Sequence, residues 1–286
     1  MKTNEISRND KTTAYTHKDA LRILAVFPLI TAILGVDGVA LAQDTQALAS
    51  ADWKISLGLG GAYRPDYEGS KDYTPGVMPD FAISYRDIVF LRGPSLGVNV
   101  ITVNGPNGRD KFQVGPIVRY RPGRDQDDND ALHGLGDIDP SVEVGGFVRY
   151  AAGPVSAEVM VVQDVAGGHD GVLVEASVGY GIPINASLRA NLRAASTWAS
   201  DNYMQTYFGI SSVQASRSTR TPFDAHAGLK DIGLSLGVEY DVTEHWGIGG
   251  RIGYTRLLGD AADSPIVRDA GSADQVMTSV SARYRF

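Results

Sequence analysis

The chain has 286 residues, a formal net charge of −7, 33 glycines, 13 tyrosines and no cysteine. The acidic balance makes nucleic-acid binding a poor expectation, and the lack of cysteine excludes both lipoprotein acylation and a disulfide framework. After the N-terminal segment no apolar run reaches 18 residues, which excludes a helical membrane protein. The abundance of glycine and tyrosine favours strands and turns over a helical core.

Residues 1–42 are predicted to form a signal peptide. A long basic region precedes a mostly apolar stretch from Ile23 to Val36. Ala40 and Ala42 then supply the small side chains that signal peptidase accepts, which places the cut after Ala42. The apolar stretch is shorter than the roughly 20 residues of a membrane anchor. We therefore expect an exported protein, with residues 43–286 forming an outer-membrane β-barrel.

The exported part alternates between apolar and polar residues. The first such stretch runs from Trp53 to Tyr63, with an aromatic residue at each end of its apolar face, as in a barrel strand that crosses a bilayer. Eleven further strands are predicted, at 76–85, 88–92, 95–104, 111–121, 140–150, 154–164, 171–181, 184–196, 230–240, 245–257 and 275–286. The short stretch at 88–92 leads into Gly93-Pro94, and fusion with its neighbour would leave ten strands. The predicted fold class is an all-β, antiparallel transmembrane barrel of about twelve strands.

The lengths of the connections separate a barrel from a sandwich. With twelve strands, long loops follow the odd strands and tight turns follow the even ones, apart from the short connection at 93–94. Transmembrane barrels show this asymmetry, with long extracellular loops and short periplasmic turns. A Greek-key sandwich has no reason to show it.

The inward face of the predicted barrel carries charges of both signs. These charges leave two functions open. The arginines could line a small-solute channel that favours anions, or the acids could pair with them and plug the lumen. The inward arginines are Arg119, Arg149, Arg189, Arg193, Arg251, Arg283 and Arg285, and the inward acids are Glu143, Glu158 and Glu175.

The loops offer weak chemical motifs. Residues 124–130 read RDQDDND, but Asp130 stands where a calcium loop needs glycine and Gly136 where it needs glutamate. A solvated acidic loop is favoured over a loose cation site shared with lipopolysaccharide phosphates. The longest loop, 197–229, is rich in aromatic and basic residues, and is predicted to be an inward constriction, an outward contact surface or a lid packed on itself.

Serine and histidine residues also crowd these loops. The histidines are His133, His169, His226 and His245, and His226 lies close to Asp224. Hydrolysis would need a serine–histidine contact with a third group orienting the base, which the sequence does not place together. We expect no enzyme, with no catalytic, cofactor-binding or metal-binding residue and no cofactor.

The last predicted strand, 275–286, alternates cleanly and ends its apolar face with Tyr284 and Phe286. A terminal phenylalanine after alternating apolar residues resembles the recognition signal of the bacterial barrel-assembly machinery. That machinery is therefore an expected partner, acting through Phe286.

Several segments together are similar to the family of MltA-interacting protein and OmpV. They are SLGLGGAYRPDYEGS at Ser56–Ser70, PDFAISYRD at Pro79–Asp87, DNYMQTYFGIS at Asp201–Ser211, the run Ala227–Val267 and the ending RYRF. The resemblance implies a non-enzymatic outer-membrane barrel. One member is a scaffold that joins a lytic transglycosylase to a peptidoglycan synthase, and others are adhesins or osmotic-response proteins. The resemblance brings no catalytic or ligand residues with it.

Together these expectations describe a scaffold or interaction protein of the cell envelope, located in the outer membrane. Its expected partners are outer-membrane lipid and lipopolysaccharide, murein hydrolases or synthases, and no nucleic acid. The alternative is a small-solute channel. An adhesin or an outer-membrane hydrolase is less favoured.

Overall fold

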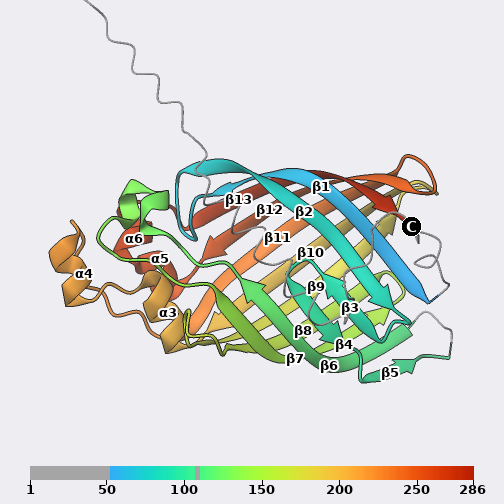
Figure 1. The fold of residues 1–286 in the computed structure, drawn as a ribbon, viewed down its shortest axis with the longest axis horizontal. Coiled ribbons are helices and arrows are strands. Elements are labelled where there is room, and N and C mark those ends of the chain that lie inside the picture. Colours follow the sequence, from blue (N-terminus) through green and yellow to red (C-terminus); the bar gives the residue numbers. More distant parts are fainter. Residues whose placement is uncertain (1–51, 107–109) are drawn as a thin grey trace, which may run out of the picture. The chain divides into compact units, whose positions relative to one another are not determined.

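A computed structural model of the protein describes residues 52–106 and 110–286. The predicted signal peptide and its cut lie outside the described residues. Thirteen antiparallel strands form one sheet that closes on itself (Figure 1). The strands are β1 (Trp53–Pro65), β2 (Tyr73–Tyr85), β3 (Val89–Arg92), β4 (Ser95–Val98), β5 (Ile101–Asn104), β6 (Asp110–Arg121), β7 (Ser141–Ala152), β8 (Val155–Asp164), β9 (Val172–Pro183), β10 (Leu188–Ala199), β11 (Gly228–Asp241), β12 (Trp246–Leu257) and β13 (Asp274–Arg285).

The twelve-strand prediction is confirmed, because β4 and β5 both pair with β6 and act as two halves of one strand. The predicted strand 95–104 is interrupted at Asn99 and Val100. The Asn99 N–H donates to the carbonyl of Ile88 and the Asn99 side-chain amide donates to that of Asp87. These bonds draw Asn99 toward the β2–β3 turn and out of the ladder with β6.

For one strand the predicted first residue is wrong. The stretch 184–196 was expected to be a strand, whereas β10 begins at Leu188. The side-chain oxygen of Asn185 accepts hydrogen bonds of 2.9 Å from the N–H groups of Ser187 and Leu188. This Asx turn competes with strand formation and places Asn185 to Ser187 in a turn.

The outer surface of the barrel is apolar. Along β1, Leu57, Leu59 and Tyr63 are exposed, and the other long strands repeat the pattern. Exposed aromatic residues stand near both ends of this surface: Tyr63, Trp198 and Tyr254 near one end, and Tyr150, Tyr180, Tyr240 and Trp246 near the other. A continuous apolar belt between two aromatic rims is the surface of a barrel that meets lipid. Within residues 52–106 and 110–286, no helix combines the length and apolarity needed to cross a membrane.

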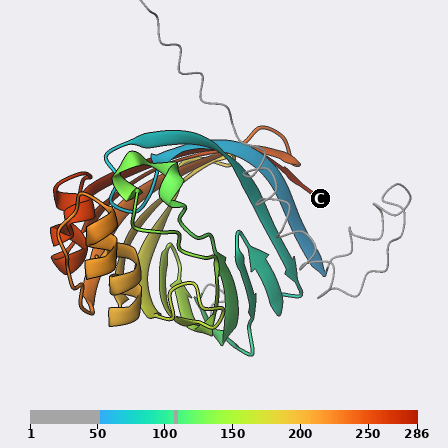
Figure 2. The ribbon, with the colours of Figure 1, turned by 60° about the vertical axis from the view of Figure 1, so that its left-hand side comes forward.

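The predicted asymmetry of the connections is confirmed. Figures 1 and 2 show the helices gathered at one end of the barrel, which we call the loop end. The short connections after β2, β5, β7, β9 and β11 lie at the other, which we call the turn end. The helical segments are η1 (Gln126–Asp128), η2 (Asp130–Leu132), α3 (Asp201–Phe208), α4 (Ser212–Arg217), α5 (Gly259–Asp263) and α6 (Pro265–Arg268).

Candidate functional site

Helix α3, which we call the lid, packs at the loop end and belongs to the long loop expected between residues 197 and 229. Tyr203, Met204, Tyr207 and Phe208 are buried and share one face of the helix. The Tyr203 and Tyr207 rings stack with their centroids 4.5 Å apart. The buried face of α3 packs against the barrel wall, which fits both the inward constriction and the self-packed lid predicted for this loop.

The wall next to α3 carries a buried charge cluster centred on Glu143 of β7. The Glu143 side chain is fully buried, and its two carboxylate oxygens accept from Arg119 Nε at 2.5 Å and from Arg121 Nε at 2.7 Å. Arg119 also reaches Glu175 on β9, with Nη2 2.8 Å from Oε1. Two guanidinium groups thus share one buried carboxylate. Their positive charges offset part of the desolvation cost of burying that carboxylate.

His169, in the loop after β8, completes this cluster. Its Nδ1 accepts a hydrogen bond from the Gly171 N–H, so the ring proton lies on Nε2. Nε2 is 3.1 Å from Glu143 Oε1 and donates to it. The imidazole also packs edge-on against Tyr203, with centroids 4.9 Å apart. His169 therefore links α3 to the charged wall.

A second ion pair anchors α3 from the opposite wall. The register between β10 and β11 shifts at Thr197 and Trp198, so that Lys230 and Asp231 are both buried. Lys230 Nζ contacts Glu68 Oε1, and it also lies 2.6 Å from Asp231 Oδ2. The Tyr203 hydroxyl donates to the other oxygen of Glu68 at 3.0 Å.

These contacts shift the acidities of the groups around the lid. Burial acts to raise the pKa of Glu68, but attraction to Lys230 and the hydrogen bond from it outweigh burial, and the pKa of Glu68 lies below its ordinary value. Burial raises the pKa of Tyr203, as does the nearby Glu68 carboxylate. Burial raises the pKa of Tyr207 to about 12. Glu68 is therefore charged at neutral pH and both tyrosines keep their protons.

Pairing of the inward arginines with Glu143, Glu158 or Glu175, one of the two predicted alternatives, is confirmed for Arg119 and Arg149, and three more of the seven arginines pair with acids that were not predicted. Arg119 contacts Glu143 and Glu175, and Arg149 Nη2 contacts Glu158. Near the turn end the pairs are Arg189 with Glu239 and Asp241, Arg283 with Asp80 and Glu239, and Arg285 with Asp241. Within the described part of the chain, Arg193 bonds only to Ser177 Oγ, at 2.9 Å, and Arg251 forms no ion pair.

The lumen widens away from the lid into a cavity of about 1360 Å³. Its walls come from β2 and from β9 to β13, and its charged lining residues are Asp80, Arg189, Glu239, Arg251 and Arg283. Most of these groups neutralise one another, so Arg251 is the main uncompensated charge along this wall among the described residues. Charged side chains therefore line part of a cavity that also has apolar walls.

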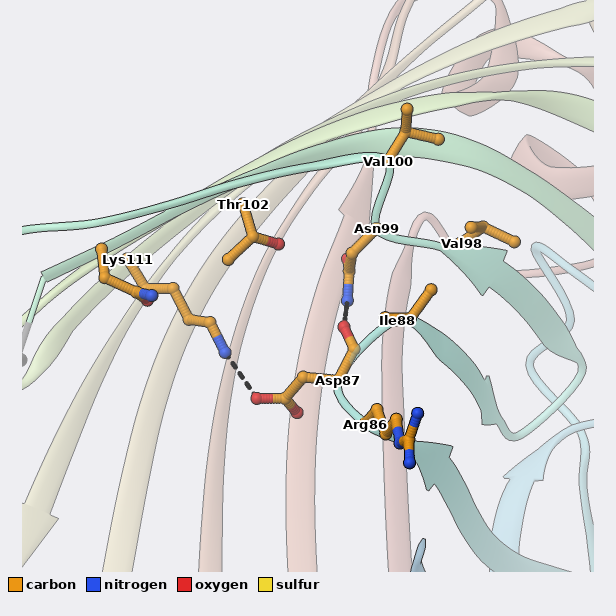
Figure 3. A pocket seen from close by; sticks show the side chains of 9 residues that line it. Arg86, Asp87, Ile88, Val98, Asn99, Val100, Thr102 and Lys111 are labelled. Carbon is orange, nitrogen blue, oxygen red and sulfur yellow. Dashed lines mark hydrogen bonds and ion pairs between the residues drawn. The ribbon is translucent and has the colours of Figure 1, made fainter. Parts of the chain in front are cut away.

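A smaller pocket of about 510 Å³ lies at the turn end, beside the break between β4 and β5 (Figure 3). Lys111 Nζ is 2.6 Å from Asp87 Oδ2, and the Asn99 amide donates to the Asp87 carbonyl at 2.6 Å. The hydrogen bond from Lys111 holds the pKa of Asp87 below its ordinary value. The buried Oδ1 of Asn99 has no hydrogen-bond partner among the described residues.

The turn that borders this pocket has an unusual backbone. Arg86 and Asp87 have φ of 51° and 56°, in the left-handed region that side chains other than glycine rarely adopt. Arg86 Nη2 is fixed by Asp52 Oδ2 at 2.7 Å, and Asp87 is fixed by Lys111. The ion pairs of Arg86 and Asp87 therefore stabilise the left-handed backbone conformation of this turn, which is otherwise unfavourable.

The other predicted chemical candidates do not converge. In the acidic loop, Asp125 and Asn129 cap η1 and η2, and the Asn129 amide donates to Asp66 and Asp72. Within the described residues, no group of three or more His, Asp or Glu side chains is arranged to hold a metal ion. The histidines lie in loops and turns as expected. His169 contacts Glu143, and His226 Nδ1 lies 4.0 Å from Asp201 Oδ1.

The sequence did not single out the groups that join distant loops. Sequence patterns gave no reason to pair Glu68 with Lys230, or Asn99 with Asp87. A polar Asn99 within an alternating strand was the one available signal. The Glu68 contact joins residues 162 positions apart, which local spacing does not reveal.

Comparison with known proteins gives a family match over most of the chain. A family model described as MltA-interacting protein MipA matches residues 57–286. The MltA-interacting protein of Escherichia coli (strain K12) is 25% identical over 272 residues, which span 93% of this chain and 99% of that protein. The protein of the same name from Shigella flexneri gives the same values.

Solved structures resemble the chain only distantly. OprB of Pseudomonas putida is 8% identical, with a TM-score of 0.45 over 82% of this chain and 94% of that one. The outer membrane channel DcaP of Acinetobacter baumannii is 9% identical, with a TM-score of 0.41 over 82% of this chain and 96% of that one. The likeness is one of barrel architecture and says nothing about what this chain binds.

Proposed function

The chain belongs to the MltA-interacting protein family, and from this premise we propose that it is an outer-membrane barrel whose turn end binds a murein-remodelling enzyme. The short turns of outer-membrane barrels face the periplasm, where murein lies. The curated relatives carry a name that states an interaction with MltA. The proposed partner is therefore a lytic transglycosylase of the MltA type, and the proposed role is that of a scaffold.

The packing of α3 at the loop end is the observation that carries this proposal. A barrel that serves mainly as a pore needs a continuous passage, whereas α3 and the Glu143 cluster fill the loop end with buried side chains. The turn end instead presents a pocket bordered by a rigid turn. A preorganised surface binds a partner with less loss of conformational entropy than a flexible one.

The turn-end pocket offers specific polar groups to such a partner. Asn99 Oδ1 is a buried acceptor without a donor among the described residues, so a partner N–H would satisfy it. Asp87 and Lys111 provide charges of both signs at the rim. A charged or polar loop of the enzyme fits this arrangement better than an apolar one.

The proposal is tested by measuring the affinity of the refolded barrel for a purified MltA-type transglycosylase. Asp87→Asn keeps the side-chain shape and removes the charge, and we expect it to weaken binding about tenfold, the scale of one important interface residue. Asp263→Asn, at an exposed position of the loop end, is the matched control and should bind as the wild type does. Absence of wild-type binding, or equal loss in the control, would contradict the proposed site.

A channel for small anions is the second candidate, and the cavity lined by Arg251 favours it. This role requires a continuous passage past α3, whose buried side chains occupy the loop end. Conductance of the refolded protein in a planar bilayer distinguishes the two roles. Reproducible steps with a fixed preference for anions would support the channel.

A further inference from the structure

β5 has one edge that no described strand covers. β4 and β5 both lie along β6, but β4 is also paired with β3, whereas β5 pairs with β6 alone. Within residues 52–106 and 110–286, no other strand lies along the second edge of β5. We call this edge the free edge. Its residues, Ile101–Asn104, are all exposed.

The ladder with β6 decides which backbone groups point to the free edge. The Gly105 N–H donates to the Asp110 carbonyl, and successive residues of an antiparallel strand direct their backbone groups to opposite edges. Thr102 and Asn104 therefore direct theirs away from β6. Their two N–H and two C=O groups form no hydrogen bond within the described part of the chain. Such a row of donors and acceptors is a template for one more strand.

The free edge borders the turn-end pocket, so there is room beside it. Thr102 and Asn104 line this pocket of about 510 Å³, and Figure 3 shows Thr102 on one side and Arg86 and Asp87 on the other. The volume lies within the range of ordinary ligand sites. The far side of the pocket is the turn that the ion pairs of Arg86 and Asp87 hold in place. An added strand would therefore lie between β5 and a rigid turn.

The two faces of β5 define the pattern that a matching strand needs. Ile101 and Val103 are more than half exposed and lie on the outer face of the wall, where Val103 is opposite Phe112. Thr102 and Asn104 lie on the inner face, toward the pocket. Neighbouring strands of a sheet place side chains of the same face next to one another. A matching segment therefore has apolar residues on its outer face and polar residues on its inner face.

The pocket side carries a surplus of positive charge. Lys111 and Lys54 share one acid, Asp87, with Nζ 2.6 Å and 3.8 Å from its carboxylate, and Arg86 is paired with Asp52. Among the described residues at this turn, three cations thus face two acids. Acidic side chains on the inner face of an added segment would balance the surplus. Asp87 contributes by holding the two lysines at the pocket, and not by touching the segment.

A second copy of the chain does not suit the free edge. Two barrels in one membrane have their turn ends on the same side, so a two-fold axis between them runs along the membrane normal. Joining the two free edges about this axis would place the apolar face of one β5 beside the polar face of the other. The pattern of β5 therefore favours a different chain as the occupant.

We propose that the free edge of β5 receives an extended segment of the periplasmic partner by strand addition, with acidic residues of the segment facing Lys111 and apolar residues facing the membrane interface. This inference rests on the proposed function, because the segment belongs to the enzyme bound at the turn end. Main-chain hydrogen bonds to Thr102 and Asn104 supply affinity, and the alternating side chains supply specificity.

A proline substitution separates the backbone from the side chain in the test. Thr102→Pro removes the N–H that points to the free edge and leaves the ladder with β6, since proline is tolerated at such positions of an edge strand. Thr102→Ala removes the same hydroxyl and keeps the N–H, so it is the matched control. Each refolded barrel is first required to show the mobility shift of a folded barrel on heating.

The first probe is a fluorescent seven-residue peptide in which valine and glutamate alternate, and its binding is measured by fluorescence anisotropy. We expect equal affinity for the wild type and Thr102→Ala, and about tenfold weaker binding to Thr102→Pro, the scale of a lost hydrogen bond together with a blocked edge. A peptide in which valine and lysine alternate should bind the wild type more weakly than the acidic peptide. The second probe is the purified MltA-type transglycosylase, whose affinities should follow the same order among the three barrels.

Hydrogen exchange gives a measurement that needs no variant. The acidic peptide should slow exchange at residues 102 and 104 of the wild-type barrel. Unchanged exchange would overturn the proposal, as would strong protection of these residues in the barrel alone, because another part of the same chain would then cover the edge.

The two probes distinguish failure of this inference from failure of the proposed function. Equal binding of the acidic peptide to Thr102→Pro and Thr102→Ala, or equal affinity for the two peptides, would overturn strand addition of an acidic segment. An enzyme that binds Thr102→Pro as tightly as Thr102→Ala would overturn the inference and leave binding at the turn end standing. A wild-type barrel that binds the peptide but not the enzyme would overturn the proposed function and leave the free edge as a site of strand addition.

Discussion

Lys230 and Glu68 form an ion pair at the loop end of the barrel, although 162 positions separate them in the chain. The pair ties the loop after β1 to the bulged start of β11, and Tyr203 of α3 donates to the same carboxylate. One carboxylate thus holds two walls and the lid together. The contacts that hold α3 at this end therefore include the charge of Glu68.

The lid is predicted to loosen in acid. The pKa of Glu68 is lowered in the folded protein, so its contribution to stability is complete above the ordinary glutamate value of about 4.3 and is lost as the pH falls through the lowered value. Protonation then leaves Lys230 without its main partner. Bilayer conductance measured at neutral pH and at a pH below the lowered pKa of Glu68 should be higher at the lower pH.

Glu68→Gln is the control for this pH dependence. The variant should conduct at both pH values, with a much smaller change between them. A response to acid as large as that of the wild type would show that another group controls the lid.

Glu143→Gln is predicted to destabilise the barrel by about 3–5 kcal/mol, because it leaves the half-buried Arg119 and Arg121 without their shared charge. Urea unfolding of the refolded protein measures the loss. Glu158→Gln, which removes the partly exposed partner of Arg149, should cost clearly less. Equal losses would indicate that the buried carboxylate has no special role.

Tyr203→Ala is predicted to open the lumen, whereas Tyr203→Phe should leave it mostly closed. The alanine variant loses the stack on Tyr207, the edge contact with His169 and the volume that fills the mouth. The phenylalanine variant keeps the ring and loses only the hydrogen bond to Glu68, which is worth about 1 kcal/mol or somewhat more to a charged acceptor. Single-channel recording compares the two, and silence from both would show that the passage is blocked elsewhere.

Arg251→Gln, added to Tyr203→Ala, should reduce the preference of the opened barrel for anions. Arg251 lines the cavity without an acid partner among the described residues, whereas most other lining charges are paired. The reversal potential in a salt gradient reports the change. Arg268→Gln, on an exposed loop-end helix, serves as the comparison. An unchanged reversal potential would count against the channel role.

The sequence was sufficient for the features that depend on local patterns. Alternation placed the strands and their faces, and the lengths of the connections separated the loop end from the turn end. The inward charges of Arg149 and Glu158 are neighbours across one hairpin, so their pairing followed from the strand positions.

The sequence does not predict the length over which two neighbouring strands stay paired. The sequence predicts a short strand at 88–92, and in the structure β3 pairs with β2 only over Ala82–Tyr85. The interruption at Asn99 arises from contacts with a turn that precedes it by 12 positions. The site around Glu68 needs two loops and the start of β11 in their folded positions, and no spacing rule brings them together.

Closure of the ring also constrains the order of events during folding. Most neighbouring strands are joined by a hairpin and can pair as soon as both exist, but β1 must wait for β13, and Ser56 then pairs with Arg285. Bringing such distant segments together is slow because loop-closure entropy must be overcome before any contact forms. Until that moment both outermost strands are exposed edges that can pair with other chains. The interval before β13 docks is therefore when the nascent protein is most prone to aggregate and most in need of a chaperone.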